Sequence, residues 1–165
     1  MVGFLRKHKA LSGMVSAIIL TALWYLFRPE KLFINERVNE AAPVAAVGQA
    51  HPIYTGRLHG ELHEVSGRAT ILRQTDGTLI LRLSDFHTTI DPDLHVVLAL
   101  ADDPALKSTS PGKGLASVDV GALKGNVDDQ SYSIPANTDP ARYNTVAIYS
   151  ERSQAVFGAA SLQPF

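Results

Sequence analysis

The chain has 165 residues, of which 45% are hydrophobic and 19% charged, and this length predicts one domain with short appendages. Its 15 basic and 16 acidic residues leave a formal net charge of -1, so the chain lacks the basic footprint of a nucleic-acid-binding protein. Cysteine is absent, which excludes disulfides, thiolate metal ligands and cysteine nucleophiles.

The first feature along the chain is an apolar run from Ala10 to Phe27 that contains no charged residue. As a helix this run would span about 27 Å, close to the roughly 30 Å of a hydrocarbon core. We therefore predict a transmembrane signal anchor at residues 10–28, in preference to a buried core helix. Bulky residues from Trp24 onward stand where signal peptidase requires small ones, so we expect the anchor to stay uncleaved.

The residues on either side of this run predict its orientation and a spacer. Arg6, Lys7 and Lys9 precede it without an acidic residue, which favours a cytoplasmic tail at residues 1–9. The remainder of the chain is then expected in the periplasm or outside the cell, tethered to the cell membrane by a single pass. Residues 29–50 mix charge with Ala, Pro and Gly without a sustained period, and we predict a stalk there.

Residues 51–165 consist of short apolar runs separated by turn residues. Apolar and polar residues alternate over 63–71, as in a half-buried strand, and Asp76-Gly77 predicts a hairpin turn before a strand at 79–83. Further strand-length runs occur at residues 94–100, 117–120, 131–134, 145–150 and 155–162. Because no helix-length amphipathic run interrupts them, we predict an all-β domain, either an antiparallel β-sandwich or an open barrel.

Six blocks of residues occur in a fixed order within this domain. They are His63-x-Val65-Ser66-Gly67-x-Ala69, Leu83-x-Asp85-Phe86, Pro92-Asp93-Leu94-x-Val96-x-Leu98, Val120-Gly121-x-Leu123-Lys124-Gly125, Gln130-x-Tyr132-x-Ile134-Pro135, and Val146-x-Ile148 followed by Val156-Phe157-Gly158-x-Ala160-x-Leu162. Taken together, the blocks resemble the DM13 domain family and cover nearly the whole of the predicted domain.

The resemblance implies a small extracytoplasmic β domain with a proposed role in electron transfer or redox chemistry. In the family this role is attributed to a nearly invariant cysteine after the Val-x-Ile strand, and this chain has Ser150 at the expected place. Serine does not cycle between thiol and disulfide and is a poor ligand for copper or haem. If Val146 and Ile148 face the core, Ser150 also points inward, with its hydroxyl bonded to backbone or to a side chain such as His63.

The candidate site residues are Ser150, His63, Asp85 and Asp93. Imidazoles bind copper or zinc, which makes His63 and His95 the candidate metal ligands, although a structural role for His63 is the favoured interpretation. His59 and His63 would lie about 13 Å apart along a strand, too far to share a metal. Asp91 and Asp93 flank a proline, so turn and capping roles are favoured over metal binding there.

No nucleotide-binding glycine motif, Gly-x-Ser-x-Gly or His-Glu-x-x-His is present, so we predict no enzyme of a familiar class. Our first hypothesis is a membrane-tethered, non-enzymatic interaction or scaffold module with an extracytoplasmic protein partner and no cofactor. The alternative is an electron-transfer or metal-binding accessory domain that contacts copper or haem and a redox partner. The absence of cysteine favours the first hypothesis.

Overall fold

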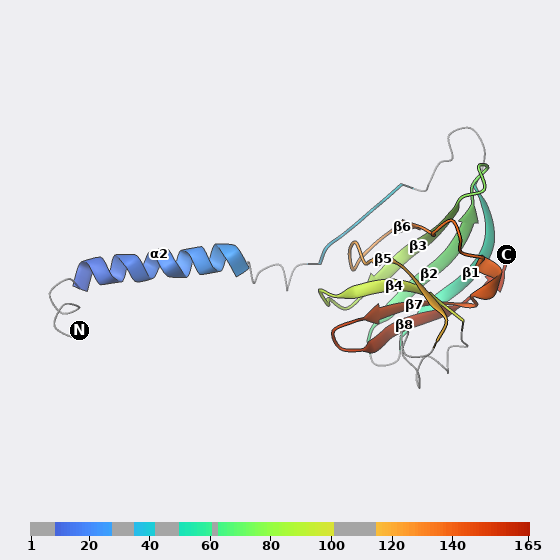
Figure 1. Cartoon of the computed structure of the whole chain (residues 1–165). Coiled ribbons are helices and arrows are strands. Elements are labelled where there is room, and N and C mark those ends of the chain that lie inside the picture. Colours follow the sequence, from blue (N-terminus) through green and yellow to red (C-terminus); the bar gives the residue numbers. More distant parts are fainter. Residues whose placement is uncertain (1–8, 28–34, 42–49, 61–62, 101–114) are drawn as a thin grey trace. The chain divides into compact units, whose positions relative to one another are not determined.

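The chain divides into two compact units, Met1–Ile34 and Asn35–Phe165. The computed structural model (Figure 1) describes residues 9–27, 35–41, 50–60, 63–100 and 115–165.

The first unit contains the helix α2 (Lys9–Phe27), which coincides with the predicted apolar segment. Within the described part of the chain, no helix combines the length and the apolar character that crossing a membrane requires. The segment is therefore helical, as its composition predicts, but the prediction of a membrane-spanning anchor at residues 10–28 is not supported.

In its described residues, the second unit is all-β apart from one short 3-10 helix, η2 (Pro140–Arg142). Its described strands are β1 (His51–His59), β2 (Val65–Arg73), β3 (Leu79–Thr88), β4 (Leu94–Ala99), β5 (Ser117–Ala122), β6 (Gln130–Ser133), β7 (Thr145–Ser150), β8 (Ala155–Ser161) and β9 (Gln163–Pro164). The all-β prediction is confirmed.

The strands form one antiparallel sheet in the order β5-β4-β7-β8-β1-β2-β3-β6, with β9 paired to β1. The two end strands approach each other, because a Cβ placed on Gly121 of β5 would lie 3.7 Å from the ring of Tyr132 of β6. The backbone N–H of Lys124, just after β5, also donates to the Tyr132 hydroxyl at 3.1 Å. A single sheet is therefore nearly closed on itself. Of the two predicted architectures, the β-sandwich and the open barrel, the structure matches the barrel-like one.

Alternation along the strands builds the core. Ile71 on β2 and Leu81 and Leu83 on β3 are fully buried, as their period of two predicts. Burial of each such side chain contributes about 2 kcal/mol before the entropy of ordering is counted. The Asp76-Gly77 turn forms as predicted, with Gly77 at a φ of 86°.

Residues 35–41, named the strap below, belong to the β unit although the sequence predicted a stalk over 29–50. The Val38 N–H donates to the Val127 carbonyl at 3.0 Å, and the Glu40 N–H to the Asp129 carbonyl at 2.9 Å. The strap thus pairs backbone groups with the segment that precedes β6, and residues 35–41 show no apolar period that would predict this contact.

Candidate functional site

Ser150 lies at the end of β7 with its side chain inside the barrel. Like Val146 and Ile148 on the same face, it is fully buried. Its Oγ accepts a hydrogen bond from the Ser153 N–H at 3.2 Å. The expected burial and the backbone partner are confirmed, whereas the suggested partner His63 stacks its ring on Phe157.

Asp93 acts on the same turn as Ser150. Its Oδ2 accepts from the Arg152 N–H at 2.7 Å, and its own N–H donates to Asp91 Oδ1 at 3.1 Å. The predicted turn and capping role of these aspartates therefore fits the structure. Asp93 and Ser150 together fix the turn at residues 151–154, which joins β7 to β8.

Three possible metal ligands converge where this turn begins. One ligand atom each from His95 on β4, Asp119 on β5 and Glu151 in the turn lies within 4.8 Å of the other two. His95 Nδ1 and Asp119 Oδ2 are 2.8 Å apart, and Asp119 Oδ1 accepts from the Gly121 N–H at 2.8 Å. The group, named the His95 trio below, is accessible, because the side chains of His95 and Asp119 are 24% and 50% exposed.

The strand pairing explains how the trio assembles. His95 pairs with Ala122 of β5 on one side and with Tyr149 of β7 on the other. The β4–β5 register shifts between Val96 and Val97, and this irregularity accompanies Gly121 at a φ of 142°. Two strands and one turn therefore bring together residues that are 24 to 56 positions apart in the sequence.

The other two predicted site residues lie elsewhere. The half-buried His63 ring is parallel to that of Phe157 within 4°, with the ring centroids 3.6 Å apart. This packing contact stands in place of the hydrogen bond to backbone or carboxylate that we expected for a structural histidine. Asp85 is exposed on β3, and its backbone N–H donates to Asp129 Oδ1 at 2.9 Å. Neither residue joins the His95 trio.

Asp85 belongs to a β-bulge that explains two of the sequence blocks. The β2–β3 register shifts between Ser66 and Arg68, and Asp85 has a φ of 49°. Gly67 has a φ of 123°, and a Cβ there would approach the Ser84 carbonyl oxygen to 2.8 Å. Only glycine fits this position without strain, so the Ser66-Gly67 block has a conformational cause.

A buried polar network accounts for two further blocks. Gln130 is fully buried; its Nε2 donates to the Gly125 carbonyl at 2.9 Å, and its Oε1 accepts from the Tyr132 hydroxyl at 2.6 Å and the Lys124 N–H at 3.2 Å. Burial raises the pKa of Tyr132 well above its ordinary value, so the phenol remains a donor. These side chains close the barrel.

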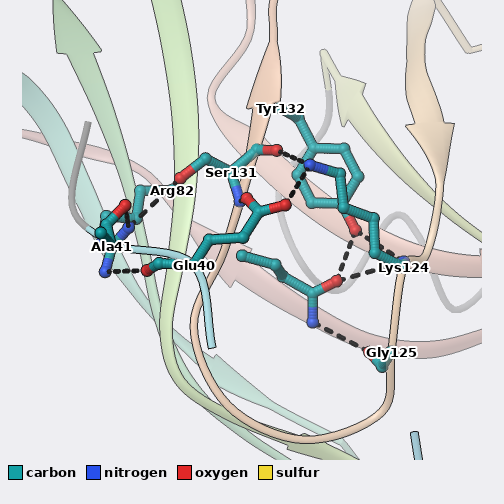
Figure 2. A network of polar contacts seen from close by, with 8 residues as sticks. Glu40, Ala41, Arg82, Lys124, Gly125, Ser131 and Tyr132 are labelled. Atoms are coloured by element: carbon teal, nitrogen blue, oxygen red, sulfur yellow. Dashed lines mark hydrogen bonds and ion pairs between the residues drawn. The ribbon is translucent and has the colours of Figure 1, made fainter. Parts of the chain in front are cut away.

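Figure 2 shows how the strap joins this network through Glu40. The Glu40 carboxylate accepts from Lys124 Nζ and from the Ser131 N–H, both at 2.7 Å. The hydrogen bond from Lys124 is the main cause that lowers the pKa of Glu40 below its ordinary value. Arg82 donates to the carbonyls of Glu40 at 3.2 Å and Ala41 at 3.3 Å, and to Asp129 Oδ2 at 2.6 Å.

The fold and these networks define a class: a small antiparallel β-barrel domain with a bulged strand pair and a barrel closure built on buried polar groups. The family model described as electron transfer DM13 matches residues 57–162. The chain belongs to the DM13 family, which confirms the resemblance drawn from the six blocks. No curated protein and no solved structure gives a significant match.

Proposed function

We propose that this DM13 domain is a non-enzymatic binding module that holds one divalent cation at the His95 trio. The observation that carries the proposal is the convergence of three ligand atoms within 4.8 Å of one another. Tetrahedral ligands of zinc lie about 3.4 Å apart, given metal–ligand bonds of roughly 2.1 Å. Zinc binding therefore requires side-chain rotations at the accessible Asp119 and Glu151, which replace the 2.8 Å contact between His95 Nδ1 and Asp119 Oδ2 by bonds to the metal.

The donor set decides which metals fit. One imidazole nitrogen and two carboxylate oxygens suit zinc or manganese, with open positions left for water. The set does not fit a thiolate-ligated copper centre, because the sequence has no cysteine. A cysteine-based redox role of the kind proposed for the family therefore has no ligand or thiol in this chain.

The residues expected at the family's site support the trio indirectly. Ser150 and Asp93 each accept a backbone N–H of the turn that begins at Glu151. They act as positioning residues, because they fix the turn while remaining outside the trio itself. A bound cation would link this turn to β4 and β5 and rigidify one end of the barrel.

The test is zinc binding to the full-length protein, measured by equilibrium dialysis with elemental analysis and by calorimetry. We expect about one zinc per chain, and at least tenfold weaker binding in His95→Gln and Glu151→Gln. The matched control is His51→Gln, which removes an exposed histidine at the start of β1. Equal zinc binding by all four proteins would refute the proposal.

Electron transfer is the second candidate, and the description of the matching family model favours it. Absorption spectra of the purified protein with copper(II) or haem, followed by chemical reduction, distinguish the two candidates. Stoichiometric copper or haem with a reversible spectral change would support an electron-transfer accessory domain. Zinc binding without either would support a structural module that presents its surface to a protein partner.

We also propose an extracytoplasmic location for the β domain. The basic residues Arg6, Lys7 and Lys9 followed by an apolar segment support this proposal, because export signals share that arrangement. Alkaline phosphatase fused after Phe165 should be active in intact bacterial cells. Activity of a cytoplasmic reporter at the same position, with inactive phosphatase, would contradict this location.

A further inference from the structure

Two arginines face each other across neighbouring strands on the outside of the barrel. Arg57 on β1 pairs directly with Arg68 on β2, and both side chains are exposed. Among the described residues, neither guanidinium has a hydrogen bond or an ion pair. Like charges directly opposite in an antiparallel pair are destabilising, so stability alone does not explain the pair.

The two arginines line a shallow pocket of about 320 Å³. Its other lining residues are Ser66, Gly67 and Asp85, which belong to the β2–β3 bulge described above. The bulge thus adds a hydroxyl, a backbone segment without a side chain and one carboxylate to the arginine pair. The volume lies at the lower end of the range for small-molecule sites.

We propose that this pocket binds a carboxylate group that carries a neighbouring hydroxyl or amine. Two guanidinium groups and one aspartate give the lining a formal charge of +1, which one carboxylate neutralises. Guanidinium groups bind carboxylates through paired N–H donors. Asp85 accepts only hydrogen bonds when ionised, and so favours a ligand with a donor beside its carboxylate.

The pocket and the His95 trio share no residue, so this proposal stands independently of the cation. Residues of β1, β2 and β3 form the pocket, whereas the trio uses β4, β5 and the turn after β7. An anionic sugar docked here would give the module a recognition surface for an acidic glycan.

The test uses the full-length protein and galacturonate, which combines a carboxylate with hydroxyl groups, while NMR follows the arginine side-chain N–H signals. We expect saturable shifts with galacturonate and none with neutral galactose. Arg57→Gln and Arg68→Gln should each weaken binding at least tenfold. Arg73→Gln, which removes an exposed arginine elsewhere on β2, should leave it unchanged.

Two further measurements, of melting temperature and of binding by a lysine variant, test the roles of the two arginines separately from the overall fold. In the absence of ligand, Arg57→Gln should raise the melting temperature by about 1 to 4 °C, because it removes the repulsion between like charges. Arg68→Lys keeps the charge but loses the planar donor fork, and should weaken binding several-fold. Binding that survives both glutamine variants, is lost equally in Arg73→Gln, or favours inorganic phosphate over galacturonate would overturn the proposal.

Discussion

Arg82 and the Arg57–Arg68 pair occupy the outer face of the same sheet, on three adjacent strands, yet their surroundings differ. The Arg82 side chain is 12% exposed and donates to Asp129, Ser131 and two carbonyls of the strap. Arg57 and Arg68 are exposed and have no partner among the described residues. Arg82 is a charge that helps to hold the fold together, whereas the charges of Arg57 and Arg68 remain available for other contacts.

The difference has an energetic basis. A charge that is largely removed from water must be paired, or its lost hydration destabilises the folded state. An exposed charge keeps its hydration and needs no partner, but two like charges held face to face repel each other. The contacts of Arg82 therefore account for its place in the fold, whereas the Arg57–Arg68 pair is explained here only by the ligand proposed above.

The largest effect is expected at Arg82. Arg82→Gln should lower the free energy of unfolding by about 2 kcal/mol, because it leaves Asp129 and the strap carbonyls without their charged donor. Urea denaturation measures this change, and Arg73→Gln serves as the control for loss of an exposed arginine. A change at Arg82 no larger than in the control would remove the distinction between the two regions.

Glu40 provides a pH-dependent test of the paired region. In the folded state the pKa of Glu40 lies below its ordinary value of 4.5. As the pH falls through this range, the unfolded state therefore binds more protons than the folded state. The stabilisation is therefore present above about pH 4.5 and is lost as the pH falls through the lower folded pKa. Because the side chain is 34% exposed, solvent screening limits this contribution to about 1 kcal/mol.

Glu40→Gln should remove that part of the pH dependence and cost up to about 1 kcal/mol at neutral pH. Thermal melts between pH 3 and 7 measure both quantities. Asp139→Asn, at the N-cap of η2, is a matched control for loss of a carboxylate away from the strap. If Asp139→Asn reduced the pH dependence of stability by the same amount, the acid sensitivity could not be attributed to Glu40.

Ser150 extends the comparison to a neutral group with a satisfied hydrogen bond. Ser150→Cys should change the free energy of unfolding by no more than about 1 kcal/mol, because volume is kept and one neutral hydrogen bond weakens. The change places a thiol at the position expected of the family's cysteine. Chemical denaturation gives the stability, and thiol titration before and after unfolding reports burial; an unfolded variant would contradict the inward placement.

The smallest expected effect has the opposite sign. Arg57→Gln should stabilise the ligand-free protein by about 0.5 kcal/mol, since it relieves repulsion without breaking a described contact. The double variant Arg57→Gln with Arg68→Gln should gain no more than either single change, because one substitution already removes the repulsion. Additive gains would show that the two arginines do not interact.

Much of the barrel was predictable because its strands bury one face. Alternation located β2, β3 and β7, and the Asp76-Gly77 turn set the pairing of the central hairpin. The first strand, β1, was not predicted. The β1–β2 register shifts between Pro52 and Tyr54, and Gly56 lies where a Cβ would collide with the Ser161 carbonyl. The inward positions of β1 are therefore not a regular series of apolar residues.

The candidate site was predictable only in part, for a different reason. His95 was identified by its side-chain chemistry, and Ser150 by its place in a family block. No local sequence pattern marks Asp119 or Glu151 as a metal ligand, because the order of strands around the sheet is what brings them close to His95. The strap was missed likewise, since its hydrogen bonds go to the segment around Val127 and Asp129 rather than to a periodic partner.

The strap has a consequence for the behaviour of shortened forms of the protein. β6 is the last strand of the sheet, and the strap occupies the outward Ser131 N–H through Glu40 and the preceding carbonyls of Val127 and Asp129. A protein that starts at residue 48 would retain every described strand but uncover these groups. Uncovered hydrogen-bonding groups at a sheet edge can pair with strands of other molecules. Because the strap covers these groups, its removal should favour oligomers over monomers.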